Sequence, residues 1–229
     1  MKPQIKGISS MATRSVLADL VLAYPERDSA SIEIESVGGV DAAKRVQAGE
    51  AFDLVFLAAD VIDRLIDAGH LRPGRFDLVR SGVAVAVRAG APRPDIGNAA
   101  GVRAAVLAAR SIGYSTGPSG VALKELFQRW GIFEQIEGRL VTAPPGVPVG
   151  ALVARGEIEL GFQQLSELLT VPGIDLLGAL PAEIQITTVF SAGISAGSNQ
   201  ADAARALLDF MTSPAATPIK RRHGMDAAS

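Results

Sequence analysis

The feature that most constrains the fold is a regular alternation of strand and helix patterns along the chain. Residues 54–58 form a continuous apolar run, which is typical of a parallel strand buried on both faces. Residues 31–37 alternate Ile with Glu, the pattern of a strand with one buried face. Up to residue 80 the patterns predict strands at 3–8, 31–37 and 54–58 and helices at 11–23, 41–48 and 61–68. This order of βαβ units predicts a parallel sheet with crossover helices.

A second set of patterns begins at residue 83 and repeats the alternation. It predicts strands at 83–87, 111–114, 140–143, 158–162 and 187–194, and helices at 102–109, 121–130, 150–155, 166–169 and 201–211, followed by a tail. We therefore expect an α/β protein of two lobes, each a mostly parallel sheet flanked by helices. Lobe 1 would comprise residues 1–82 with 188–229, and lobe 2 residues 83–187. The chain would cross between the lobes twice, near residues 80–82 and near residues 186–188. These two crossings would form a hinge, with a ligand cleft between the lobes.

Composition excludes several classes of function. The formal net charge of −2 provides no basic field for nucleic acid. The chain has no cysteine and only two histidines, His70 and His223, neither of them in a motif, which argues against a metal site and a Ser-His-Asp triad. The loop from Gly113 to Gly120 lacks the Lys-Ser/Thr pair of a phosphate-binding loop, and no GxGxxG is present, so no cofactor is expected.

The location of the protein stays open at this stage. No run of apolar residues approaches the roughly 18 that a membrane helix needs, so membrane insertion is not expected. A strand pattern begins almost at the first residue, without a signal-peptide pattern before it. We expect a cytoplasmic protein if the chain is native as it stands, and a periplasmic one if a signal peptide has been removed.

Three loops share one plan, in which a predicted strand is followed by small polar residues or glycine and then by a helix. They are Ser9-Ser10, Gly38-Gly39-Val40 and the loop from Ser115 to Gly120. The first N–H groups of a helix have no partner within it, so such loops can bind an oxyanion. Each loop taken singly is best interpreted as an ordinary helix cap. Their shared position at the carboxyl ends of strands brings a ligand site level with that interpretation.

Several short motifs in order give the chain a family resemblance that runs nearly from end to end. The motifs are Ile8-Ser9-Ser10-Met11, the segments 47–54 and 58–60, Pro118-Ser119-Gly120, and the segments 149–153, 213–216 and 222–225. With them the chain resembles the bacterial molybdate-binding proteins and their relatives with the type II periplasmic-binding-protein fold. The resemblance implies that Ser10 holds an oxyanion, and that backbone N–H groups at Ser119 and near Val147 and Val149 assist it.

The chain departs from that family at two ligand positions. Gly39-Val40 stands where the family carries a Ser, and Gln164, preceded by Gln163, stands at the position of a family Tyr. An amide offers both donors and acceptors where the tyrosine hydroxyl is missing. These departures resemble a divergent branch near the aconitate isomerases. That resemblance implies a carboxylate ligand, with a tricarboxylate as one candidate and a 1,3-proton shift as the chemistry.

Charged side chains near the loops allow two interpretations each. Arg80, beside Ser81 at the first crossing, would bind a ligand carboxylate or form an ion pair. Asp60 would be a base near the cleft or a helix cap, and Tyr114 would face the cleft or pack. No residue stands out as a catalytic base, so the catalytic residues stay unknown. The candidate ligand-binding residues are Ser9, Ser10, Met11, Gly39, Val40, Arg80, Ser115, Thr116, Ser119, Gly120, Val147, Val149, Gln163 and Gln164.

The sequence thus predicts a protein that binds a small carboxylate or other oxyanion between two lobes. The first alternative is an isomerase of aconitate or a similar polycarboxylate, and the second is a molybdate- or tungstate-binding protein. The expected partner is a small anion, with an ABC permease as a further partner if the protein is exported.

Overall fold

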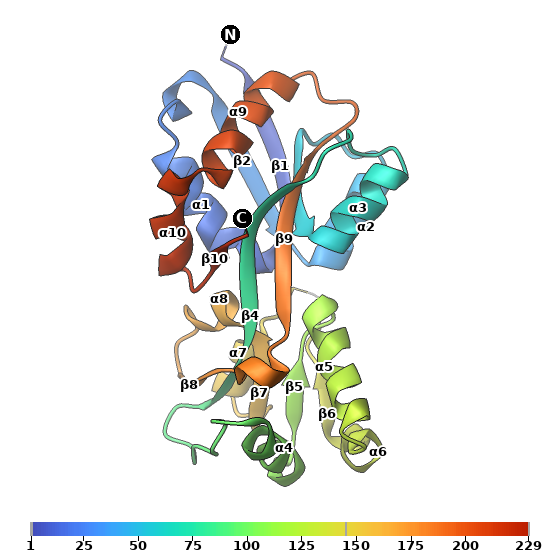
Figure 1. Cartoon of the computed structure of the whole chain (residues 1–229), viewed down its shortest axis with the longest axis vertical. Coiled ribbons are helices and arrows are strands. Elements are labelled where there is room, and N and C mark those ends of the chain that lie inside the picture. The colour runs from blue at the N-terminus through green and yellow to red at the C-terminus, as the bar shows by residue number, and fades with distance from the viewer. Residues whose placement is uncertain (1, 145, 229) are drawn as a thin grey trace. The chain divides into compact units, whose positions relative to one another are not determined.

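The protein forms two compact units in a computed structural model that describes residues 2–144 and 146–228. Unit 1 contains the residues up to Arg80 and those from Val189 on, and unit 2 contains Ser81–Thr188. Two strands, β4 (Phe76–Arg88) and β9 (Thr187–Ile194), run through the boundaries between the units (Figure 1). The mixed α/β architecture predicted from the sequence is confirmed.

Unit 1 is built on a sheet in the order β2-β1-β3-β9. The strands β1 (Gln4–Ser10), β2 (Ser31–Val37) and β3 (Leu54–Ala58) are parallel, and β9 joins β3 antiparallel. The helices α1 (Arg14–Ala23) and α9 (Ala201–Thr212) contribute to the core on one face of the sheet, and α2 (Gly39–Gln47) and α3 (Ala59–Asp67) to the core on the other (Figure 1).

Burial on both faces of the sheet explains why the sequence of β3 is apolar throughout. Leu54 and Phe56 pack into the cluster with α1 and α9, whereas Val55 and Leu57 pack into the cluster with α2 and α3. All four side chains are at most 1% exposed. Alternate residues of a strand point to opposite faces, so a strand covered on both sides has no polar position to offer.

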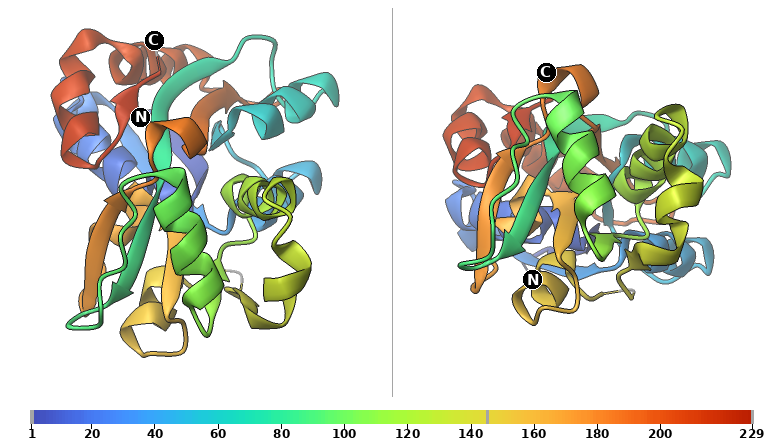
Figure 2. Two further views of the ribbon diagram at one scale, coloured as in Figure 1. Left: turned by 60° about the horizontal axis from the view of Figure 1, so that its bottom comes forward. Right: turned by 90° about the horizontal axis from the view of Figure 1, so that it is seen from below.

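Unit 2 repeats this layered arrangement around a second set of strands. The short strands β5 (Ile112–Tyr114) and β6 (Leu140–Thr142) are parallel to each other, and β5 is also parallel to β7 (Leu160–Gln164). The second half of β4 joins β7 and β8 (Ile174–Ala179), antiparallel to both. One face is covered by α4 (Ala99–Ala108), α5 (Pro118–Arg129) and α6 (Phe133–Ile136), and the other by α7 (Val149–Ala154) and α8 (Leu165–Leu168) (Figure 2).

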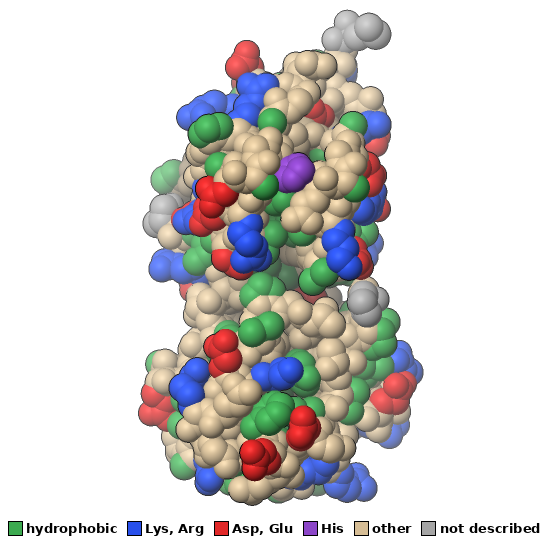
Figure 3. All heavy atoms as spheres, turned by 90° about the vertical axis from the view of Figure 1, so that its right-hand side faces the viewer, with side chains coloured by type: hydrophobic (Ala, Val, Ile, Leu, Met, Phe, Trp, Pro, Cys, Tyr) green, Lys and Arg blue, Asp and Glu red, His purple; other side chains and the backbone are tan. Residues whose placement is uncertain are grey.

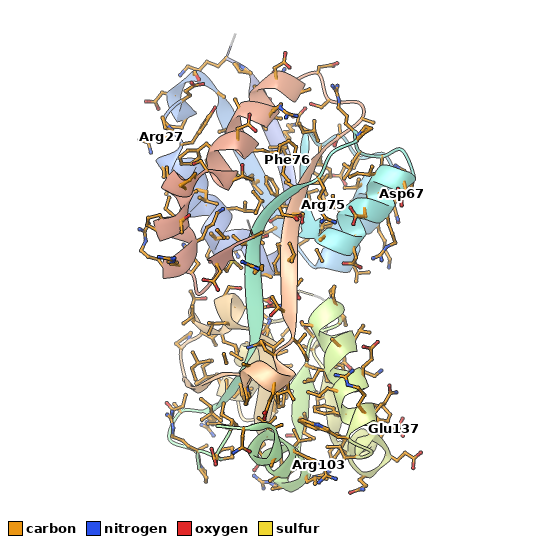
Figure 4. The ribbon with its side chains drawn as sticks, in the orientation of Figure 1. Arg27, Asp67, Arg75, Phe76, Arg103 and Glu137 are labelled. Carbon is orange, nitrogen blue, oxygen red and sulfur yellow. The ribbon has the colours of Figure 1, made fainter. Side chains whose placement is uncertain are left out.

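The first half of β4 is fastened into unit 1 by charged side chains. The Arg75 guanidinium donates to Asp77 of β4 at 2.7 Å and to Asp63 of α3 at 2.5 Å. Phe76, the next residue in the chain, has the guanidinium of Arg205 of α9 at 5.3 Å from the centre of its ring. Figure 4 labels Arg75 and Phe76. Hydrogen bonds from Arg75 and Ser191 hold the pKa of Asp77 below its usual range against the opposing effect of its burial.

Four points of the sequence analysis need correction. The residues after 212 are not a plain tail, since they form α10 (Thr217–Arg222) and β10 (Asp226–Ala227), which pairs with β4. The strand β8 has no counterpart in the sequence analysis, and β4 begins seven residues before the predicted strand at 83. Asp60 does not cap α3, because the cap position is Ala58 and the Asp60 carboxylate pairs with Arg64 at 2.9 Å.

Candidate functional site

In unit 1 the carboxyl ends of β1 and β2 bring Ser10 and Gly39 together. Ser10 ends β1 and is level with Val37 of β2, which leads through Gly38 into α2. A Cβ atom placed on Gly39 would lie 3.6 Å from the Cβ atom of Ser10. No side chain caps the start of α2. The orphan N–H groups of a nine-residue helix therefore begin beside Ser10.

The hydroxyl groups of Ser9 and Ser10 differ in what they contact. Ser9 Oγ lies 2.7 Å from Ser36 Oγ, so its hydroxyl has a protein partner. Ser10 is 7% exposed, and its Oγ is buried without a hydrogen-bond partner among the described residues. A buried hydroxyl without a partner costs about 1–3 kcal/mol, which a bound ligand would offset. Of their neighbours in the predicted set, Met11 is half-buried and Val40 is exposed.

In unit 2 the parallel pairing of β5 with β7 gathers a second group of polar residues. Gly113 is level with Gly161, so the two strands end at the same edge of the sheet, near Tyr114 and Gln164. The loop after β5 places Ser115 Oγ 3.5 Å from Ser119 Oγ in the first turn of α5. Thr116 is exposed, and the Tyr114 side chain packs in the core.

Gly120 allows a close approach between that loop and α5. A Cβ atom at Gly120 would lie 1.8 Å from the carbonyl oxygen of Ser115, so no other residue fits without moving the backbone. Because Gly120 has no side chain, the backbone of Ser115 can lie against the first turn of α5.

Gln164 has one free polar atom. Its Nε2 lies 2.8 Å from Thr188 Oγ1, and its Oε1 is buried without a partner in residues 2–144 and 146–228. Because a threonine hydroxyl both donates and accepts, the amide can also be turned by 180° and keep this bond. In that orientation the free atom is the NH₂ group, which can donate to an anion.

Gln163 connects Glu167 to the backbone of α7. Its Oε1 accepts from the N–H of Gly150 at 3.2 Å, and its Nε2 donates to Glu167 Oε1 at 2.9 Å. Glu167 is half-buried on α8, and burial raises the pKa of its carboxyl group to about 7 despite this hydrogen bond. A carboxyl group that titrates near neutral pH is typical of functional sites.

The remaining predicted residues contribute less to these two groups. The N–H of Val147 donates to the Pro144 carbonyl at 3.0 Å and is therefore not free for a ligand, and Val149 begins α7 as a buried residue. The exposed Arg80 donates to the carbonyl of Ala227 at 3.2 Å. Its guanidinium therefore bonds β10, not a strand-end loop. Arg80 also lines a cavity of about 480 Å³ with Thr212, Pro214, Thr217, Arg221, Asp226 and Ala227.

Two residues outside the predicted set have the properties of a site. Ser81 is 1% exposed, and its Oγ is buried without a partner in the described part of the chain. Sequence reasoning noted it only as a neighbour of Arg80. Glu167 lies four residues after Gln163, but nothing in that spacing shows how deeply its carboxyl group is buried.

The described residues hold neither a cluster of three side chains suited to a metal ion nor a helix long and apolar enough to cross a membrane. On the face that Figure 3 displays, basic and acidic side chains are interspersed over the surface. The polar groups at the strand-end loops are hydroxyls, an amide and helix N–H groups, so an anion there would be held mainly by uncharged donors.

Replacing Gly120 with Ala tests the close approach at the start of α5. We expect Gly120→Ala to lower the free energy of unfolding by about 2 kcal/mol or more, because the new methyl group must displace the Ser115 carbonyl. Gly138→Ala is the control, since a Cβ atom there meets nothing within 4 Å. Denaturant unfolding measures both, and equal stability of the two variants would contradict the packing described.

Replacing Glu167 with Gln tests the burial of its carboxyl group. Because the folded-state pKa is raised from 4.5 to about 7, the stability contributed by the proton is present below the lower value and is lost as pH rises through the upper one. Between about pH 5 and pH 8, wild type should lose up to about 3 kcal/mol relative to Glu167→Gln. Urea unfolding across this range measures the difference, and parallel pH profiles would refute the raised pKa.

Comparison with known proteins shows the family. The model of the bacterial extracellular solute-binding proteins matches residues 5–226. An aconitate isomerase from Pseudomonas sp. is 37% identical over 215 residues, which cover 90% of this chain and 81% of that protein. The molybdate-binding protein ModA of Escherichia coli is 26% identical over 107 residues, 47% of this chain and 41% of its own.

A solved structure shows the same fold. The periplasmic molybdate-binding protein of Azotobacter vinelandii superposes with a TM-score of 0.80 at 20% identity, covering 98% of this chain and all of that one. The resemblance read from the sequence motifs is thus confirmed. The chain belongs to the family of bacterial extracellular solute-binding proteins.

Proposed function

We propose that the protein binds a small polycarboxylate of the aconitate class at the strand-end loops of its units. The observation that carries the proposal is the unpartnered, buried hydroxyl of Ser10 beside the open start of α2. In unit 2 the free amide atom of Gln164 and the hydroxyl of Ser81 are buried in the same way. The two hydroxyls can donate a hydrogen bond to a carboxylate, and so can Gln164 in the orientation that leaves its NH₂ group free. Such bonds to charged groups contribute about 1.5–3 kcal/mol each.

Two features favour a carboxylate over a tetrahedral metal oxyanion. Gly39 offers no hydroxyl beside Ser10, so one donor for a compact anion is missing there. Glu167 titrates near neutral pH, and in its protonated form it can donate to a ligand carboxylate. The 37% identity to a curated aconitate isomerase agrees with a tricarboxylate ligand. Binding of molybdate or tungstate is the competing proposal.

The Ser10→Ala variant tests the binding proposal. We expect its affinity for trans-aconitate to fall about tenfold or more, while its stability stays the same or rises slightly, because the lost hydroxyl has no partner in the free protein. Isothermal titration calorimetry and denaturant unfolding measure the two effects.

Ser191→Ala is a matched control for that variant. Ser191 is fully buried in unit 1, but its Oγ donates to Asp77 at 2.7 Å. Its removal should lower the free energy of unfolding by about 1.5 kcal/mol and leave the affinity unchanged. The proposal fails if Ser10→Ala binds trans-aconitate as tightly as wild type does.

A second candidate function is isomerisation of aconitate, favoured by the identity to a curated aconitate isomerase across 90% of this chain. The reaction interconverts the trans and cis isomers by moving one proton from the methylene carbon to the vinyl carbon. It needs a base near the methylene group and donors near the carboxylate that takes up charge. Conversion of trans-aconitate to cis-aconitate, followed by NMR, tests this candidate.

Whether the protein has an ABC permease as its partner, and whether it is exported, depends on which of the two functions it performs. A binding protein that serves transport would act with an ABC permease and would be exported, whereas an enzyme has no such requirement. Fractionation of cells that carry the native gene tests this choice, because recovery with the periplasmic fraction supports the transport role.

A further inference from the structure

We infer that Glu167 is the base that moves the proton in this isomerisation, and that Gln163 is the residue that positions it. The inference rests on the isomerase candidate of the proposed function and names the catalytic group that the sequence left unknown. It starts from the contacts that hold the Glu167 carboxylate in place.

The amide of Gln163 has only one orientation that fits its neighbours. The side chain is 3% exposed, and its oxygen accepts from the Gly150 N–H at 3.2 Å. A backbone N–H can only donate, so the amide oxygen must face Gly150 and the NH₂ group must face Glu167. The 2.9 Å hydrogen bond to Glu167 Oε1 therefore fixes one oxygen of the carboxylate as an acceptor. The second oxygen lies outside this bond.

The helix that carries Glu167 begins at the edge of unit 2 where the other polar groups gather. β7 ends at Gln164, whose free amide atom is buried without a partner in the described residues, and α8 begins at the next residue. Glu167 thus follows that amide by three residues, at the edge where β5 leads into Ser115. In Figure 1, α8 and the start of α5 lie at the same end of unit 2.

Burial, and not a neighbouring charge, is what raises the pKa of Glu167. Two elements in contact with α8, β7 and α7, contain no titratable side chain. β4 and β8 also pack on α8 through apolar side chains, and their charged residues in unit 2 are Arg88 and Asp175. The Asp175 carboxylate accepts from the Gly90 N–H at 3.2 Å and lies 3.7 Å from the Arg93 guanidinium. Glu167 is the one titratable residue of α8 itself. Burial accordingly raises the pKa of its carboxyl group to about 7, and the Gln163 hydrogen bond only partly opposes this. Near neutral pH both the proton-accepting and the proton-donating form are populated, as a group that takes and returns one proton requires.

The proton shift then balances within the substrate and this one group. The Glu167 carboxylate takes a proton from the methylene carbon, and the electron pair of that C–H bond becomes a new C=C bond to the central carbon. The electrons of the old C=C bond move onto the vinyl carbon and into the carboxylate that this carbon carries. The NH₂ group of Gln164, in the turned orientation of its amide, can donate a hydrogen bond to that carboxylate. Protonated Glu167 returns the proton to the former vinyl carbon, so no oxidant, metal or second acid is consumed.

The test follows trans-aconitate in D₂O by proton NMR, with wild type, Glu167→Gln and a control variant. Glu134 is the matched control, because it too lies in the first turn of a four-residue helix of unit 2, but is exposed. Glu167→Gln should lose isomerisation and deuterium uptake by about 100-fold or more, and Glu134→Gln should retain both. Calorimetry should show that Glu167→Gln still binds trans-aconitate within a few-fold of wild type.

A pH profile of the wild-type protein tests the role of Glu167 without any substitution. Log kcat should rise with pH up to an inflection near pH 7 and level off above it, where the carboxyl group has lost its proton. Gln163→Leu removes the hydrogen bond that favours the carboxylate, so it should move this inflection to higher pH as well as lower the rate.

The outcomes separate the two proposals. Wild-type rates in Glu167→Gln, or a wild-type rate that stays flat between about pH 5 and pH 8, would overturn the role of Glu167. Wild type that binds trans-aconitate without turnover or deuterium uptake would overturn it too, and would leave the binding proposal standing. Wild type that binds no tricarboxylate would overturn both.

Discussion

The parallel pairing of strands that are covered on both faces is the constraint on which the candidate site depends. Pairing of β1 with β2 and β3 makes all three strands end at one edge, and helices on both faces exclude water from that edge. A polar side chain at such a strand end can be buried without a hydrogen-bond partner, as Ser10 at the end of β1 shows. Unit 2 repeats the pattern with β5 and β7, where Gln164 is the buried polar residue.

This constraint also explains how one fold can serve binding and catalysis. Uncharged donors at strand ends hold an anion without a fixed counter-charge, so they suit capture and release equally well. A proton shift needs only one more element, a carboxyl group whose pKa lies near neutral, and burial of Glu167 beside β7 and α7 provides it. The fold match to the molybdate-binding protein of Azotobacter vinelandii therefore bears on architecture, and the choice between binding and turnover depends on individual side chains.

The sequence predicted those parts of the structure that follow from local pattern. The bounds of β2, β3 and β9 agree with the prediction to the residue, and β3 is recognisable in the sequence as a continuous apolar run. The loops at Ser10 and Ser115 were found because a strand, small residues and a helix start follow one another. The end of the chain was misjudged because α10 carries Lys220, Arg221 and Arg222, a pattern of solvent exposure, whereas Lys220 is 1% exposed.

Other properties depend on contacts between distant segments and have no local signal. The hydroxyl of Ser9 is occupied because Ser36 lies opposite on β2, 27 residues away. The burial that raises the pKa of Glu167 comes in part from the packing of α8 with β7 and α7. No spacing of residues in the sequence indicates this packing. The guanidinium of Arg80 bonds Ala227, which the sequence had assigned to a tail.

The central claim is that the unpartnered groups at the strand ends select a polycarboxylate. Isothermal titration calorimetry of wild type with trans-aconitate, cis-aconitate, citrate, molybdate, tungstate and sulfate tests it most directly. The account predicts measurable binding of the tricarboxylates and at least tenfold weaker binding of the tetrahedral anions, a difference of about 1.4 kcal/mol. Binding of molybdate or tungstate alone would contradict it, and would show that Gly39 and Gln164 still leave enough donors for a compact oxyanion.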